Sequence, residues 1–267
     1  MMRKIVVVAA VGTLLAAGSA VGSATAADLP LKAPTPVPDY IYNWTGFYVG
    51  IQTGGGWDSP NWYADPTGGP TGASPAGFHD ALYKASGAYG GGQIGFNYQF
   101  GRYVVGAQAD FDGASIVGSA QCAPPVTGVV NCSSRINELG TATARIGGTY
   151  DRALFYSFGG WAWENERLSA ACPVCGVGGT PTNAVFSGGR SGWTAGVGLE
   201  YALAGPWTHW SLVLQYNYIN FGTSNLRFNI TPAVPRAFFT ENVIETMNVA
   251  KVGLNYRFGF GPIYAKD

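Results

Sequence analysis

Four cysteines carry the most direct chemistry in this sequence, and they form two local pairs, Cys122 with Cys132 and Cys172 with Cys175. Two thiols can form a disulfide, and a Cys-X-X-Cys spacing like that of the second pair also occurs in redox proteins. The second pair lies in a glycine-rich stretch without a helix N-terminus to lower a thiol pKa, so we favour disulfides over a redox role. Covalent haem attachment would need a histidine directly after Cys175, and Gly176 stands there.

The chain has two histidines, His79 and His209, in separate parts of the sequence. His79 could ligate haem from a surface loop, with Tyr63 or Tyr83 beside it, but no second ligand is fixed by spacing, so a solvated loop histidine is the simpler interpretation. An enzyme acting on lipids would need a nucleophile and a base together, and no Ser/His pair occupies suitable positions. We therefore expect no enzymatic activity, no metal ligands and no cofactor.

Six charged residues lie on the polar side of stretches in which polar and apolar residues alternate. They are Asp110, Asp112, Arg145, Glu200, Lys251 and Arg257. Alternation with a period of two indicates a β-strand with two different faces. If these strands surround one interior, the three acids and three bases share it and should pair, because an isolated buried charge is costly.

The clearest strand is the last one, which begins near Val243 and ends at Phe258. Its final ten residues place Ala250, Val252, Leu254, Tyr256 and Phe258 on one face and Lys251, Gly253, Asn255 and Arg257 on the other. An apolar face opposite a cationic one fits a membrane barrel, apolar toward lipid and polar toward the lumen. Similar patterns predict strands at 44–57, 87–100, 103–112, 137–150, 154–166, 192–203 and 207–221. The facing of 154–166 is ambiguous, because both of its sides carry aromatic residues.

The connections between these segments alternate in length. Tight turns are predicted at 101–102, 151–152 and 204–206, and long loops at 58–85, 113–135, 167–190 and 222–242. An even number of strands with short turns at one end and long loops at the other is typical of bacterial outer-membrane barrels. The predicted fold is therefore all-β, an eight-stranded antiparallel up-and-down transmembrane β-barrel, which leaves no backbone group unpaired in lipid.

A soluble lipocalin-like barrel is the alternative, because it also has eight antiparallel strands. It would turn the apolar face inward, and alternation alone does not say which face is inside. Charged residues make up 11% of the chain and aromatic residues 14%, and no apolar run of about 18 residues follows the N-terminus. Three features favour the membrane barrel over the soluble one: the low charge, the aromatic residues near strand ends and the export signal.

The N-terminus has the features of an export signal: Arg3 and Lys4, a short apolar stretch at 5–17, and small residues at 24–26. We predict a secretory signal peptide at 1–26, a proline-rich periplasmic leader at 27–43, the barrel at 44–258 and a short C-terminal tail at 259–267. Export leads to an oxidising compartment. Of the three connectivities that four cysteines allow, we favour the local pairs Cys122–Cys132 and Cys172–Cys175.

Three stretches resemble the porin-like outer-membrane immunogenic proteins of alphaproteobacteria. They are Asp28-Leu29-Pro30, residues 44–50 (Trp-Thr-Gly-Phe-Tyr-Val-Gly) and residues 251–258 (Lys-Val-Gly-Leu-Asn-Tyr-Arg-Phe). The resemblance implies a barrel related to the small OmpA-like membrane domain. It also implies an abundant surface antigen or structural protein, and some close relatives are described as haem binders. In contrast to many barrels, the chain continues for nine residues beyond Phe258.

The interior of an eight-stranded barrel is just wide enough for side chains to fill. We therefore predict a lumen plugged by charge pairs and a structural or surface-antigen role in the outer membrane. The alternatives are a low-conductance porin for small solutes and a surface haem-binding protein that uses His79. Expected partners are outer-membrane lipid, lipopolysaccharide, the barrel assembly machinery through the last strand, and an extracellular ligand at the loops. The net charge of zero gives no reason to expect nucleic acid.

Overall fold

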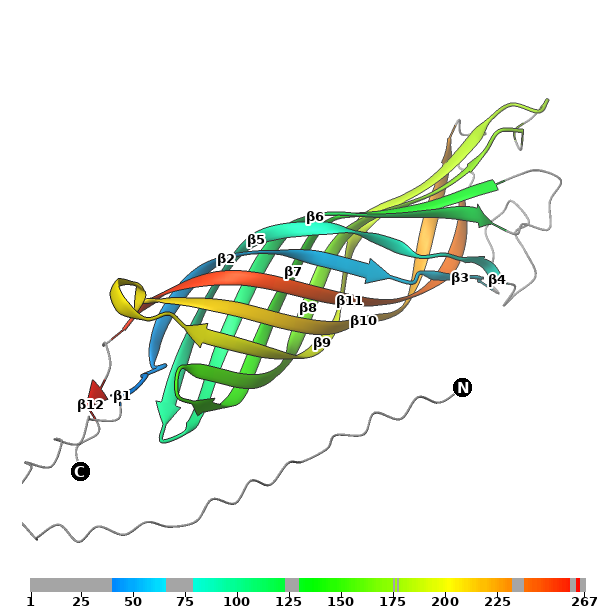
Figure 1. The fold of residues 1–267 in the computed structure, drawn as a ribbon. Helices are drawn as coiled ribbons and strands as arrows, with labels where there is room; N and C mark the ends of the chain where they lie inside the picture. The colour runs from blue at the N-terminus through cyan, green and yellow to red at the C-terminus, as the bar shows by residue number, and fades with distance from the viewer. Residues whose placement is uncertain are drawn as a thin grey trace, which may run out of the picture. The chain divides into compact units, whose positions relative to one another are not determined.

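The computed structural model describes residues 40–65, 79–122, 130–174, 176, 178–231, 238–259 and 263–264. The predicted signal peptide and most of the leader lie outside these ranges. Eight long strands close into a ring (Figure 1). They are β2 (Gly46–Asp58), β5 (Ala85–Phe100), β6 (Tyr103–Cys122), β7 (Val130–Tyr150), β8 (Ala153–Cys172), β9 (Thr182–Ala202), β10 (Trp210–Thr231) and β11 (Phe238–Phe258).

Each strand of the ring pairs antiparallel with the strands before and after it, and β11 closes the ring by pairing with both β10 and β2. Figure 1 shows the blue β2 and the red-orange β11 side by side. The prediction of an eight-stranded up-and-down barrel is therefore confirmed. In the described part of the chain, no helix is long and apolar enough to cross a bilayer.

The two faces of the barrel wall have opposite character. On β2, Phe47 is 62% exposed and Ile51 is 70% exposed, whereas Tyr48 and Gln52, the residues that directly follow them, are buried. The same alternation places Phe155 and Trp161 of β8 outside and its Leu154, Tyr156 and Phe158 inside, which decides the facing that the sequence left ambiguous. The wall thus carries large apolar side chains outside and amides, acids and cations inside. This is the arrangement of a membrane barrel and the reverse of a soluble one.

The strands are longer than predicted, and several predicted loops were wrong. Most of 113–135 and 167–190 continues β6, β7, β8 and β9 as regular ladders. The extension was missed because the outward side chains stop being apolar beyond the lipid band, as at Asn165 and Arg167 of β8. Backbone pairing continues there without the alternation that marks a lipid-facing strand.

The predicted loop 58–85 also contains regular structure. Within it, β3 (Asn61–Ala64) and β4 (His79–Leu82) form a hairpin, and β3 pairs with β11 beyond the end of β2. At the opposite end of the barrel, the three tight turns fall where predicted, and Gly101, Asp151 and Gly205 adopt positive φ angles of 60°, 51° and 68°. Glycine and aspartate tolerate this left-handed conformation better than most residues. Here β1 (Tyr40–Ile41) pairs with β12 (Ile263–Tyr264), and η1 (Gly205–Trp207) follows β9.

The interior is filled in layers, which can be followed from the tight turns toward the loops along β8. Leu154, Tyr156 and Phe158 belong to a cluster with Trp44, and Ala162 belongs to a second apolar cluster. Two buried glutamates come next, and Leu168 then joins a third cluster. We call the second and third clusters the inner and outer apolar layers. The inner layer contains Ala85, Tyr89, Ile116, Ile136, Leu139, Ala162, Ile219, Phe221, Met247 and Val249. The outer layer contains Trp62, Ala81, Tyr83, Cys132, Leu168, Ala184, Leu226, Phe228 and Val243.

Candidate functional site

Strand alternation brings the predicted charged residues together in the lumen on the turn side of the inner apolar layer, where Arg145 and Arg257 contact the Trp44 cluster. All six are buried. They come from four strands, with Asp110 and Asp112 on β6, Arg145 on β7, Glu200 on β9, and Lys251 and Arg257 on β11. Because each side chain points inward from a different part of the wall, the charges meet across the lumen.

Glu200 is the centre of this network. Its Oε2 lies 3.4 Å from Arg145 Nη1, and its Oε1 lies 2.9 Å from Arg257 Nη2. Ser211 Oγ and Asn255 Nδ2 also donate hydrogen bonds to Oε1, at 2.5 and 3.1 Å. One carboxylate therefore binds side chains from β7, β10 and β11, and charge-assisted hydrogen bonds of this kind are about twice as strong as neutral ones.

Arg145 is held in place by aromatic rings as well as by Glu200. Its guanidinium carbon lies 4.7 Å from the Tyr48 ring centroid and 4.9 Å from that of Tyr156. Its Nε donates to Asn97 Oδ1 at 2.8 Å. A guanidinium enclosed between two rings has little freedom to turn away, so these contacts fix Arg145 in its position inside the lumen.

The second part of the network surrounds Asp110. Lys251 Nζ lies 3.1 Å from Asp110 Oδ2, and Thr141 Oγ1 donates to the same oxygen at 2.8 Å. The expectation that all six charges pair was wrong for Asp112. Within the described residues it binds the Gln52 amide, which donates to both of its carboxylate oxygens at 2.9 Å. Register places Gln52 opposite Asp112 across β5, and Lys251 binds Asp110 instead.

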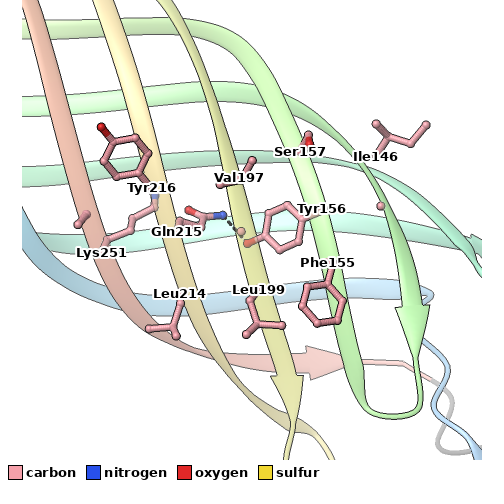
Figure 2. A pocket seen from close by; sticks show the side chains of 13 residues that line it. Ile146, Phe155, Tyr156, Ser157, Val197, Leu199, Leu214, Gln215, Tyr216 and Lys251 are labelled. Atoms are coloured by element: carbon pink, nitrogen blue, oxygen red, sulfur yellow. Dashed lines mark hydrogen bonds between the residues drawn. The ribbon is translucent and has the colours of Figure 1, made fainter. Parts of the chain in front are cut away.

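A pocket lies at the wall formed by β7 to β11 (Figure 2). Its lining is mostly made of outward apolar side chains, such as Phe155, Leu199 and Leu214. Figure 2 also shows Gln215 Nε2 donating to Tyr156 Oη at 2.6 Å, a bond that reaches from β10 to β8 past the glycine at position 198 of β9. The pocket is thus a depression in the lipid-facing wall, backed by the lumen network.

The predicted Cys122–Cys132 disulfide is confirmed. It joins β6 to β7 with 5.6 Å between the Cα atoms. The prediction for Cys172 involves Cys175, which lies outside the described residues.

The two histidines lie at opposite ends of the barrel. His79 is exposed on β4, and its ring centroid is 5.0 Å from that of Tyr63 on β3. Tyr83, the other tyrosine expected beside His79, follows β4 and is buried in the outer apolar layer against Trp62. His209 follows η1, where its Nδ1 lies 3.2 Å from the backbone oxygen of Arg257.

A second charged cluster, which the sequence analysis missed, lies between the inner and outer apolar layers. It contains Asp58, Glu164, Glu166, Arg190 and Glu245, all of them buried, and we call it the rim cluster. Arg190 Nη1 lies 3.2 Å from Glu166 Oε2 and 3.9 Å from Glu164 Oε1, and it also contacts Glu245. Carboxylate oxygens of the three glutamates lie within 4.8 Å of one another.

The rim cluster lies at the loop-side border of the lipid-facing band. Trp57 is exposed one residue before Asp58, and Trp161 three residues before Glu164. On the neighbouring strand β9, which runs in the opposite direction, Trp193 is exposed three residues after Arg190. Exposed tryptophans of this kind mark the interface between lipid and water. Outside the band, burial raises the pKa of the Glu164 and Glu166 carboxyls well above their usual range, and the nearby Glu245 carboxylate raises it further.

One signal in the sequence points to the rim cluster. Glu164 and Glu166 continue the buried even-numbered positions of β8 beyond Tyr156 and Phe158. Arg190 was assigned to a loop, and only the strand register places it opposite Glu164. Glu245 is brought in by closure of the barrel, which a linear pattern does not show.

Comparisons with known proteins agree with this architecture. A family model described as "Outer membrane protein beta-barrel domain" matches residues 13–258. The chain is 32% identical over 267 residues to the 31 kDa outer-membrane immunogenic proteins of Brucella melitensis and Brucella suis, covering 96% of this chain and 100% of each relative. The solved structure of OprG from Pseudomonas aeruginosa is similar at 14% identity and a TM-score of 0.47, covering 82% of this chain and 98% of that chain. Neisserial surface protein A is similar at 13% identity and a TM-score of 0.34, covering 80% and 98%.

Proposed function

Because the chain belongs to the family of outer-membrane protein β-barrel domains, we propose that it is a structural surface protein whose lumen is plugged by charge pairs. The resemblance to outer-membrane immunogenic proteins is confirmed by the Brucella relatives, and the protein is an outer-membrane β-barrel. The single observation that carries the proposal is the Glu200 network, in which one buried carboxylate binds Arg145 and Arg257 across the lumen. The relatives' description as immunogenic proteins supports exposure at the cell surface.

The strength of such ion pairs supports a plugged lumen over a lumen that conducts ions. Breaking a buried ion pair by removing one partner costs about 3–5 kcal/mol. A fluctuation with a cost of that size would be populated in less than about 1% of molecules, since about 1.4 kcal/mol corresponds to a factor of ten. The proposal includes no catalytic role.

We expect the refolded barrel to show no discrete current steps in a planar bilayer. The physical reason is that Arg145 lies between the Tyr48 and Tyr156 rings and binds Glu200, so ions have no continuous hydrated route. The measurement is single-channel recording after a heat-dependent gel shift has confirmed folding. Arg145→Ala removes this obstruction and should introduce current steps.

Arg135→Ala is the matched control for that recording, because Arg135 is an exposed arginine on the same strand, β7. It should be as silent as the unmodified barrel. Regular steps from the unmodified protein, with an amplitude that changes in Arg145→Ala but not in Arg135→Ala, would replace the plug by the low-conductance porin.

A second candidate, haem capture at the surface, is favoured by the contact between His79 and Tyr63. Histidine and tyrosine are both haem ligands in proteins. This candidate predicts a Soret shift when haemin is added to the folded barrel, and a loss of most of that shift in His79→Ala. His209→Ala, at the other end of the barrel, is the control and should bind as the unmodified protein does. An absorption spectrum equal to that of free haemin, or an equal loss in both variants, would remove haem capture from consideration.

A further inference from the structure

The rim cluster has more negative charge than its own residues neutralise. When ionised, its four carboxylates, Asp58, Glu164, Glu166 and Glu245, carry four negative charges, and Arg190 supplies one positive charge. Three negative charges therefore remain, between two apolar layers. Burying an uncompensated charge costs several kcal/mol, so an arrangement like this requires either protons or a cation from solution.

Five of the eight carboxylate oxygens in the cluster also lack hydrogen-bond donors. Glu164 is 1% exposed, and neither of its carboxylate oxygens accepts a hydrogen bond. One oxygen each of Asp58, Glu166 and Glu245 is likewise buried without a partner. Buried polar atoms are nearly always satisfied, so this concentration of bare acceptors at one point indicates a ligand that accepts electron pairs.

We propose that the rim cluster is a binding site for one calcium ion, with Glu164, Glu166 and Glu245 as its ligands. Ca²⁺ takes carboxylate oxygens at about 2.3–2.6 Å, so two oxygens on opposite sides of one ion are roughly 5 Å apart. The three glutamates offer oxygens within 4.8 Å of one another, which suits a single ion without a rearrangement of the strands. Bound Ca²⁺ would reduce the excess charge from three to one.

Calcium fits this position better than magnesium. Mg²⁺ retains several water molecules in most protein sites, whereas Ca²⁺ accepts six to eight oxygens in flexible geometry, including bidentate carboxylates. The rim cluster is closed above and below by apolar side chains, among them Met247 and Val243 on β11. Such surroundings favour the ion that replaces most of its hydration shell by carboxylate oxygens.

The ion would tie together strands that are distant in the chain. Glu164 and Glu166 lie on β8, Arg190 on β9 and Glu245 on β11, while Asp58 ends β2 beside Glu245. A calcium ion here would hold the rim of the barrel closed where the strands leave the lipid. The surface loops would then start from a rigid base in the presence of Ca²⁺.

The test is calorimetric titration of Ca²⁺ into the full chain, refolded in detergent without lipopolysaccharide and freed of metal by a chelator. We expect one saturable site, with affinity at least tenfold weaker in Glu164→Gln, which keeps the shape of the side chain and removes its charge. Titration with Mg²⁺ should give at least tenfold weaker binding than Ca²⁺. Glu245→Gln is the second variant, in case Glu164→Gln does not refold.

Glu138→Gln is the matched control, because Glu138 pairs with Asn165 next to Glu164 and points outward into solvent. It should bind Ca²⁺ as the unmodified protein does. The heat-dependent gel shift confirms that every protein is folded before titration. The absence of a saturable Ca²⁺ site, or unchanged affinity in Glu164→Gln and Glu245→Gln, would overturn the proposal and leave protons as the neutralising charges.

Discussion

Glu200→Ala should lower the free energy of unfolding of the barrel by about 3–5 kcal/mol, the cost of breaking a buried ion pair by removing one partner. The glutamate neutralises both Arg145 and Arg257 and accepts hydrogen bonds from Ser211 and Asn255. Its loss leaves two guanidinium groups facing each other in the lumen. Urea titration of the refolded protein in lipid vesicles, followed by tryptophan fluorescence, measures the effect.

Two variants make this result specific to the network. Glu200→Gln keeps one acceptor oxygen and the volume of the side chain, so it should cost less than Glu200→Ala. Glu138→Ala removes an exposed glutamate on β7 and should change stability by no more than about 0.5 kcal/mol, as is usual for surface positions. Equal stability of Glu200→Ala and the unmodified barrel would mean that water enters the lumen freely and that the charge pairs do not plug it.

Val197→Arg is the second large effect, with an expected loss of about 2–4 kcal/mol, the range for a cation on the lipid face near the bilayer midplane. Val197 is exposed on the outer face of β9, midway between Tyr201 at the turn side and Trp193 at the loop side. A cation at this depth has no counter-charge and little water. The same urea titration in vesicles measures the loss.

Ser187→Arg is the matched control, because Ser187 is exposed on the same strand beyond the tryptophan band. The cost of a cation falls to about 0–1 kcal/mol near the interface, so Ser187→Arg should be close to neutral. If Val197→Arg and Ser187→Arg were equally stable, the outer face of β9 would not be in contact with lipid and the depth assigned to the band would be wrong.

The layered interior connects these predictions with the proposed ion site. The Glu200 network is nearly neutral, because Arg145, Arg257 and Lys251 offset Glu200 and Asp110, with Asp112 bound by an amide. The rim cluster has one cation for four carboxylates. The Glu200 network therefore stabilises the barrel without a ligand, whereas the rim cluster is complete only when a further positive charge is present.

Local sequence pattern was enough to predict the eight strands and the three tight turns. Apolar and polar residues alternate with a period of two wherever a strand faces lipid on one side and lumen on the other, and glycine or aspartate occupies each turn that needs a positive φ. The same alternation identified Arg145, Glu200 and Arg257 as residues that share one face. These features depend on neighbouring residues, so the linear sequence contains them.

The tertiary structure alone decided which residues meet and how far the strands extend. Beyond the lipid band the outward residues lose their apolar character, so β8 and β9 could not be followed to Cys172 and Thr182 by pattern. Glu164 meets Arg190 through the β8–β9 register, and it meets Glu245 only because β11 pairs with β2 and closes the ring. Contacts across a barrel depend on register and closure, which are properties of all the strands together and not of any one segment.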